Sequence, residues 1–115
     1  MAYDKPFLDY LVQELLVGQE VSVRPMFGGV SIYQEGVIVG MVVGSSFYLK
    51  ADDTSQADFA AAGCGPFMYH SKNGPVAMSY WEVPGEVLED RERLAAWMAK
   101  SLAVAKNKKK ARKAE

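Results

Sequence analysis

The chain has 115 residues, half of them apolar and 23% charged, with a formal net charge of −1. This length suits one domain, because about two-thirds of the unfolded surface can be buried on folding. The single cysteine, Cys64, excludes an internal disulfide, and no apolar run reaches the roughly 18 residues that a transmembrane helix needs. The N-terminus has no apolar signal core, so we expect a cytoplasmic protein.

The charge is unevenly distributed. Residues 106–115 hold six basic residues and one acidic residue, a net charge of +5. From the totals of 13 and 14, this leaves seven basic and thirteen acidic residues in 1–105, a net charge of −6. The basic segment has no apolar stripe with which a helix could pack. We therefore predict a folded acidic domain over residues 1–105 and a disordered basic tail over 106–115.

The first part of the chain predicts a helix and then a strand. Asp4 is suited to the N-cap, Pro6 to the first turn and Gly18 to the end of the helix. Residues 21–24 then alternate with period two, as in a strand. The helix has an apolar face at three- and four-residue spacing, made of Phe7, Leu8, Leu11, Val12, Leu15 and Leu16.

The strand leads into the stretch RPMFGG at residues 24–29. Proline fixes φ, and glycine allows positive φ and close approach of the backbone, so the stretch predicts a sharply shaped bend that carries apolar side chains. It contains no nucleophile, general base or metal ligand. Because the glycines lead into another strand and not into a helix, the pattern is not that of a phosphate-binding loop.

Three strand-like runs follow, at residues 30–33, 37–43 and 47–50. Their short connections predict an antiparallel meander. The middle run is apolar on both faces, which indicates a central strand with helices on one face and another cover on the second. A partner subunit is one candidate for that cover, and on this ground we expect a homodimer.

The second half begins with a short helix and a hairpin. Asp53 and Gln56 have the spacing of a capping box, and a small-residue helix follows them. The runs 67–70 and 76–83 flank an Asn-Gly dipeptide at residues 73–74. That dipeptide between two strand-like runs is typical of a β-hairpin.

A final helix is expected after Asp90, which can serve as its N-cap. The order of elements is therefore helix, three strands, helix, two strands, helix. This order predicts an α+β domain with one antiparallel sheet and with the helices packed on one face.

The sequence has few candidates for catalysis or metal binding. His70 has no cysteine or carboxylate near it in sequence, and Cys64 has no second thiol. The acidic pairs Asp52-Asp53 and Glu89-Asp90 precede helices, where carboxylates act as caps. We therefore expect no catalytic residue, cofactor or metal. A small-molecule enzyme that uses His70 and a carboxylate is an alternative, which predicts that the two converge in a pocket.

The basic tail raises the alternative of direct nucleic-acid binding, because its cations could follow a phosphate backbone. Against this, lysine-rich ends also act as solubilising tails, this one lacks interleaved aromatic residues, and the acidic domain would repel DNA. The candidate contacts are Lys106, Lys108, Lys109, Lys110, Arg112 and Lys113.

Four blocks of sequence occur in a characteristic order: RPMFGG at 24–29, FYLKAD at 47–52, AGCGPF at 62–67 and VAMSYWEVP at 76–84. Together they resemble the N-terminal domain of the TfoX/Sxy family, over about residues 15–104 and so nearly the whole predicted domain. The resemblance implies an antiparallel α+β domain, able to self-associate, in a bacterial cytoplasmic protein. It also implies a regulator of natural competence, DNA uptake and transformation that acts with the catabolite regulator protein.

The resemblance attaches no catalytic role to the matching residues. Full-length regulators of this kind carry a second, helix-hairpin-helix domain where this chain has its basic tail. We therefore expect a non-enzymatic module that acts through protein–protein contacts in transcription regulation. The candidate partner-binding residues are Arg24, Met26, Phe27, Gly28 and Gly29.

Overall fold

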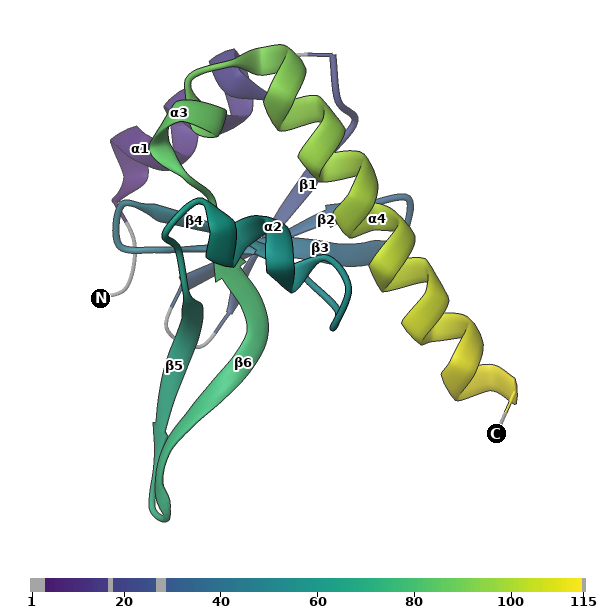
Figure 1. The fold of residues 1–115 in the computed structure, drawn as a ribbon. Coiled ribbons are helices and arrows are strands. Elements are labelled where there is room, and N and C mark those ends of the chain that lie inside the picture. Colours follow the sequence, from purple (N-terminus) through teal and green to yellow (C-terminus); the bar gives the residue numbers. More distant parts are fainter. Residues whose placement is uncertain (1–3, 17, 27–28, 115) are drawn as a thin grey trace.

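Figure 1 shows the fold in a computed structural model, which describes residues 4–16, 18–26 and 29–114, without the side chains of Met26, Tyr69, His70 and 108–114. One antiparallel sheet has the strand order β1-β2-β3-β4-β6-β5. Its strands are β1 (Ser22–Met26), β2 (Gly29–Gln34), β3 (Val37–Val43), β4 (Ser46–Lys50), β5 (Pro66–Ser71) and β6 (Gly74–Glu82). The helices are α1 (Lys5–Tyr10), continued by the π-helical η1 (Leu11–Leu15), α2 (Gln56–Ala61), α3 (Gly85–Leu88) and α4 (Arg91–Ala114).

The predicted α+β class and single antiparallel sheet are confirmed. Two details of the predicted order differ. Four strands precede α2, because the strand predicted before the RPMFGG bend pairs with β2 and forms one edge of the sheet. The short helix α3 follows Pro84, and it buries Val87 completely.

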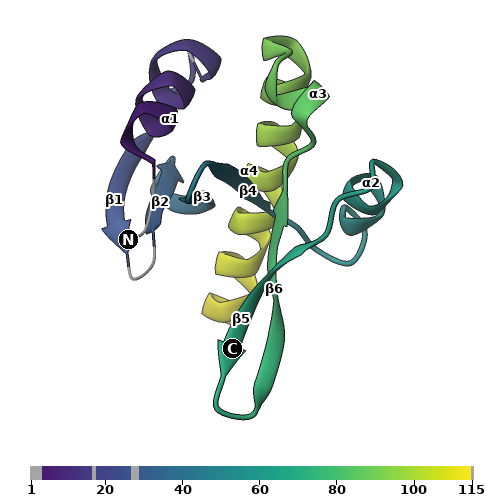
Figure 2. The ribbon, with the colours of Figure 1, turned by 90° about the vertical axis from the view of Figure 1, so that its left-hand side faces the viewer.

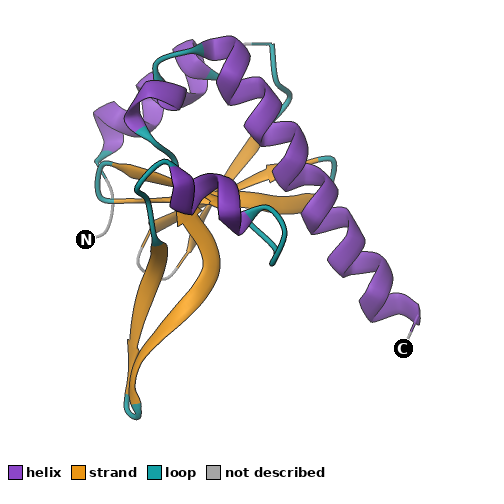
Figure 3. Ribbon diagram, in the orientation of Figure 1, coloured by secondary structure: helices purple, strands orange, loops and turns teal. Residues whose placement is uncertain are grey.

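The helices lie on one side of the sheet (Figure 3). The main core forms between them and the facing side chains of the strands. Its fully buried members include Leu11, Leu16, Ile32, Val42, Phe47, Leu49, Leu94 and Met98.

A β-bulge in β3 explains why this strand is apolar along its whole length. Ile32 pairs with Gly40 and Tyr33 pairs with Ile38, so Val39 is an extra residue without a partner on β2. A bulge shifts the alternation of side chains by one residue. Val37, Val39 and Val42 therefore all contribute to the helix-side core, although strict alternation would place Val42 on the opposite face from Val37 and Val39.

The other side chains of the sheet form a row across five strands. The row runs Arg24, Ser31, Met41, Tyr48, Glu82 through successive pairs of facing residues. Met41 is 2% exposed but lies outside the helix-side core cluster. The sheet thus has a second, smaller buried centre on the face away from the helices, which we call the second face.

Strands β5 and β6 project from the body as a hairpin (Figures 1 and 2). The pairing of β6 with β4 covers Tyr80 to Glu82, and the last backbone bond on that side joins the Ala51 N–H to the Ser79 oxygen. Between Gly74 and Met78, β6 pairs only with β5. We call residues 67–78 the arm.

Side-chain caps fix the helix starts. Asp4 accepts a hydrogen bond from the Phe7 N–H, and Asp90 accepts from the N–H groups of Glu92 and Arg93, as predicted. The capping box predicted for Asp53 and Gln56 before α2 is wrong, because the two residues that cap each other each lie one position earlier in the sequence.

That pair is Asp52 and Ser55. The Asp52 carboxylate accepts from the Ser55 N–H at 2.8 Å, and the Ser55 hydroxyl accepts from the Asp52 N–H at 2.9 Å. The residues have the same three-residue spacing as the predicted pair, so the spacing was informative but the position was not.

Helix α4 continues through the segment predicted as a tail, as far as Ala114, and its end extends past the sheet (Figure 1). The division into a domain and a disordered tail stays a prediction. In the described part of the chain, no helix combines the length and apolar character needed to cross a membrane.

Candidate protein-interaction surface

Arg24 is exposed on the edge strand β1. Its guanidinium carbon lies 5.1 Å from the centre of the Tyr33 ring on the neighbouring strand, which is a cation–π contact. The neighbouring Val23 is 42% exposed. Val23 pairs with the core residue Ile32 and lies on the helix side of β1, whereas Arg24 lies on the second face, where the Tyr33 ring holds its guanidinium in place.

The rest of the RPMFGG stretch is only partly described. Met26 ends β1 and its backbone faces Gly29, which begins β2, while Phe27 and Gly28 lie outside the described residues. A Cβ at position 29 would lie 2.3 Å from the Val42 carbonyl oxygen. Gly29 thus allows close approach of β2 to β3, as the sequence indicated.

Aromatic rings surround the buried centre of the second face. The Tyr48 and Phe67 rings meet edge to face with their centroids 5.3 Å apart, and the Lys50 ammonium lies 4.7 Å from the Tyr80 ring centre. Burial raises the pKa of the Tyr48 hydroxyl, and the nearby Glu82 carboxylate raises it further. Tyr48 therefore keeps its proton at neutral pH and can donate a hydrogen bond.

The homodimer prediction relied on a second cover for β3. Side chains of this chain already bury Met41 on the second face, so the apolar character of β3 does not by itself require a partner. The homodimer stays a prediction, and its support has to come from elsewhere in the molecule.

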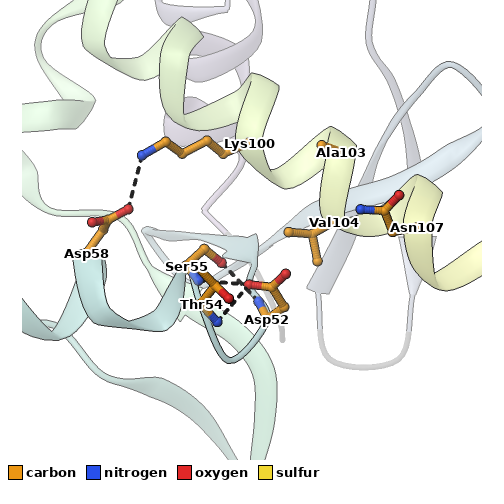
Figure 4. A pocket seen from close by; sticks show the side chains of 8 residues that line it. All are labelled: Asp52, Thr54, Ser55, Asp58, Lys100, Ala103, Val104 and Asn107. Atoms are coloured by element: carbon orange, nitrogen blue, oxygen red, sulfur yellow. Dashed lines mark hydrogen bonds and ion pairs between the residues drawn. The ribbon is translucent and has the colours of Figure 1, made fainter.

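A surface pocket of about 340 Å³ lies between the start of α2 and the middle of α4 (Figure 4). Its charged groups are already engaged: Lys100 pairs with Asp58 at 3.1 Å, and Asp52 accepts the capping bonds described above. Its lining residues are Asp52, Thr54, Ser55, Asp58, Lys100, Ala103, Val104 and Asn107.

Cys64 does not line this pocket, and the side chain of His70 lies outside the described part of the chain. The backbone of His70 belongs to β5, in the arm. Burial and then the Glu82 carboxylate raise the pKa of the Cys64 thiol, so Cys64 is a weak nucleophile at neutral pH. In the described part of the chain, no three His, Cys, Asp or Glu side chains gather as a metal site would require. The absence of enzymatic activity stays a prediction.

Lys106 is the one candidate nucleic-acid contact whose side chain is described. It forms an ion pair with Glu35 in the turn between β2 and β3. The side chains of both partners are exposed to solvent, so the ion pair contributes little to the stability of the fold. Lys108, Lys109, Lys110, Arg112 and Lys113 follow on the last turns of α4, and their side chains lie outside the description.

The sequence did not single out the aromatic residues of the second face. Tyr48 and Lys50 alternate with the buried Phe47 and Leu49, which signals a strand with two different faces. The arrangement of the rings depends on the pairing of strands that are distant in sequence, because β4 lies beside β6. No local pattern contains that information.

These features define a small α+β domain with a helix-covered core, an aromatic second face and a projecting arm. The family model of the TfoX N-terminal domain matches residues 12–105, and the chain belongs to this family, which is linked to the regulation of competence and DNA uptake. A comparison with curated proteins gave no match.

Proposed function

We propose that this protein is a non-enzymatic module of bacterial transcription regulation that promotes natural competence through protein–protein contacts in the cytoplasm. The family match supports the role in competence. The partner we propose is the catabolite regulator protein, and the contact surface is the β1 end of the sheet.

The observation that carries this proposal is the exposed Arg24 held over the Tyr33 ring on the edge strand β1. Arginine and tyrosine are enriched among the residues that contribute most to protein–protein binding. The cation–π contact restricts the arginine before binding, so less side-chain entropy is lost when a partner docks.

The test is titration of purified catabolite regulator protein with the full chain and with Arg24→Ala. We expect binding by the wild type and an affinity lower by about tenfold or more for Arg24→Ala, since a hot-spot side chain contributes roughly 2 kcal/mol. The double variant Met26→Ser with Phe27→Ser tests the adjacent bend in the same assay.

Lys5→Ala is the matched control. Lys5 is an exposed cation whose ion-pair partner Asp9 lies on its own helix α1, so its removal changes the charge equally without changing β1. Equal loss in Lys5→Ala and Arg24→Ala would show a general charge effect and contradict the proposed surface. The absence of binding by the wild type would contradict the proposed partner.

A second candidate function is nucleic-acid binding by the end of α4. The observation that favours it is that this cationic segment extends away from the acidic body in Figure 1. If the five cations after Lys106 all contact phosphates, affinity should fall by about five hundredfold between 50 and 200 mM salt.

A chain truncated after Ala105 separates the two functions. Loss of nucleic-acid binding in the truncated chain, with binding to the regulator protein retained, would assign the tail its own role. Equal nucleic-acid affinity of the full and truncated chains would reject that role.

A further inference from the structure

The two edges of the sheet are protected to different extents. On β1, Pro25 has no N–H group to offer and Arg24 is charged and exposed, both of which discourage pairing with another strand. The opposite edge strand, β5, has the sequence PFMYHS, without a charged residue. In the described part of the chain no strand pairs with its outer side.

The orientation of the backbone on β5 follows from its pairing with β6. His70 faces Pro75, which has no N–H, so this is a pair without mutual hydrogen bonds. Hydrogen-bonded and non-hydrogen-bonded pairs alternate in an antiparallel ladder, so the N–H and C=O groups of Met68 and His70 point outward from β6. At the other end, the Glu82 N–H donates to the Gly65 oxygen, which turns the next residue, Pro66, outward.

The arm also leaves apolar side chains uncovered. Met68 is 42% exposed and Val76 is 49% exposed. Over Gly74 to Met78 the arm consists of two strands only, and an isolated two-stranded hairpin is at best marginally stable in water. A third strand on the β5 edge would pair the outward backbone groups and cover Met68.

We propose that a second copy of this chain supplies that strand, with the two β5 strands antiparallel about a twofold axis at Met68. Met68 then pairs with Met68 of the second copy, and the His70 N–H donates to the Pro66 oxygen of the second copy. A twofold axis perpendicular to an edge strand produces antiparallel pairing and uses the same surface on both subunits.

Charge favours a second copy as the occupant. Lys72, at the tip of the arm, is the one Asp, Glu, Lys or Arg residue in 66–81, whereas residues 1–105 together carry a net charge of −6. Two acidic bodies therefore meet here through an uncharged strand. The proposed register also places Lys72 opposite Cys64 of the second copy, which lies close to Glu82, so opposite charges approach across the interface.

The test is the oligomeric state of the full chain by sedimentation velocity, from about 1 to 100 µM. We expect a dimer for the wild type and a monomer for Met68→Lys, because lysines directly opposite each other repel. Val23→Lys on β1 is the matched control, since Val23 is also 42% exposed on an edge strand, and it should remain dimeric.

A wild-type monomer over this concentration range would overturn the proposal, and so would a dimeric, folded Met68→Lys. Should Met68→Lys unfold by circular dichroism, Met68→Cys with a short bismaleimide, in a Cys64→Ser background, provides the second measurement. We expect a covalent dimer for Met68→Cys and none for Val23→Cys. Cross-linking at Val23, or failure at Met68, would contradict pairing through β5.

Discussion

The body of the sheet and the arm are built from similar residues but reach different degrees of burial. In the body, β3 has a strand on each side, helices over one face and aromatic side chains around the other, and Met41 and Val42 are almost completely buried. In the arm, Met68 and Val76 remain largely exposed. Apolar composition therefore does not determine burial here, and the number of neighbouring layers does.

The largest expected effect tests the body. Phe47→Ala removes a ring that is 1% exposed at the centre of the helix-side core, and should lower the free energy of unfolding by about 3–5 kcal/mol. Urea denaturation measures this loss. A loss below about 1 kcal/mol would mean that the body is no better packed than the arm.

Gly40→Ala tests how closely β3 and β4 approach in the body. A Cβ at position 40 would lie 2.4 Å from the Tyr48 carbonyl oxygen, so the two backbones have to move apart. We expect a loss of about 1–3 kcal/mol in the free energy of unfolding. Gly85→Ala is the control, because a Cβ at position 85 meets no atom within 4 Å.

Asp52, in the segment between β4 and α2, should make the free energy of unfolding depend on pH. Hydrogen bonds from the Ser55 N–H, with a contribution from Thr54, lower the pKa of the Asp52 carboxyl in the folded state. Its stabilising effect is thus present above the unfolded-state pKa, near 4, and is lost as pH falls through the lower folded-state value.

Asp52→Asn keeps a capping side chain but cannot titrate. We expect the wild type to lose more stability than Asp52→Asn between pH 7 and pH 3, as measured by urea denaturation at both values. Equal losses would show that other carboxyl groups carry the acid sensitivity.

The smallest effect is expected in the arm. Val76→Ala removes methyl groups that are already about half exposed, so the free energy of unfolding should change by less than about 0.5 kcal/mol at low protein concentration. Hydrogen exchange should show weaker protection of arm amides than of β3 amides under the same conditions. Equal protection in both regions would contradict the division between body and arm.

Much of the local structure was predictable because it depends on neighbouring residues. The turn at residues 34–36 and the caps Asp4 and Asp90 occur where the sequence places them. The hairpin is also confirmed, although its two-residue loop is Lys72 and Asn73, with Gly74 at the start of β6 and φ of 106°.

The rest could not be read from sequence because it depends on distant pairings. That β6 lies between β4 and β5 determines which rings meet Tyr48 and how far the arm projects. The apolar run of β3 indicated two covered faces, but a bulge and the chain's own side chains explain part of that pattern. The predicted contact surface, the tail and the homodimer need the experiments above.

The unpaired Val39 has a consequence for how this sequence can change by insertion or deletion. The helix-facing side chains of β3 are therefore odd-numbered up to Val39 and even-numbered after it. Removing that one residue would restore strict alternation through β3 with Val37 still on the helix side, because Ile38 and Gly40 already pair with adjacent residues of β2. A gap at residue 39 in a related sequence should therefore leave the polarity of positions 37 and 38 unchanged.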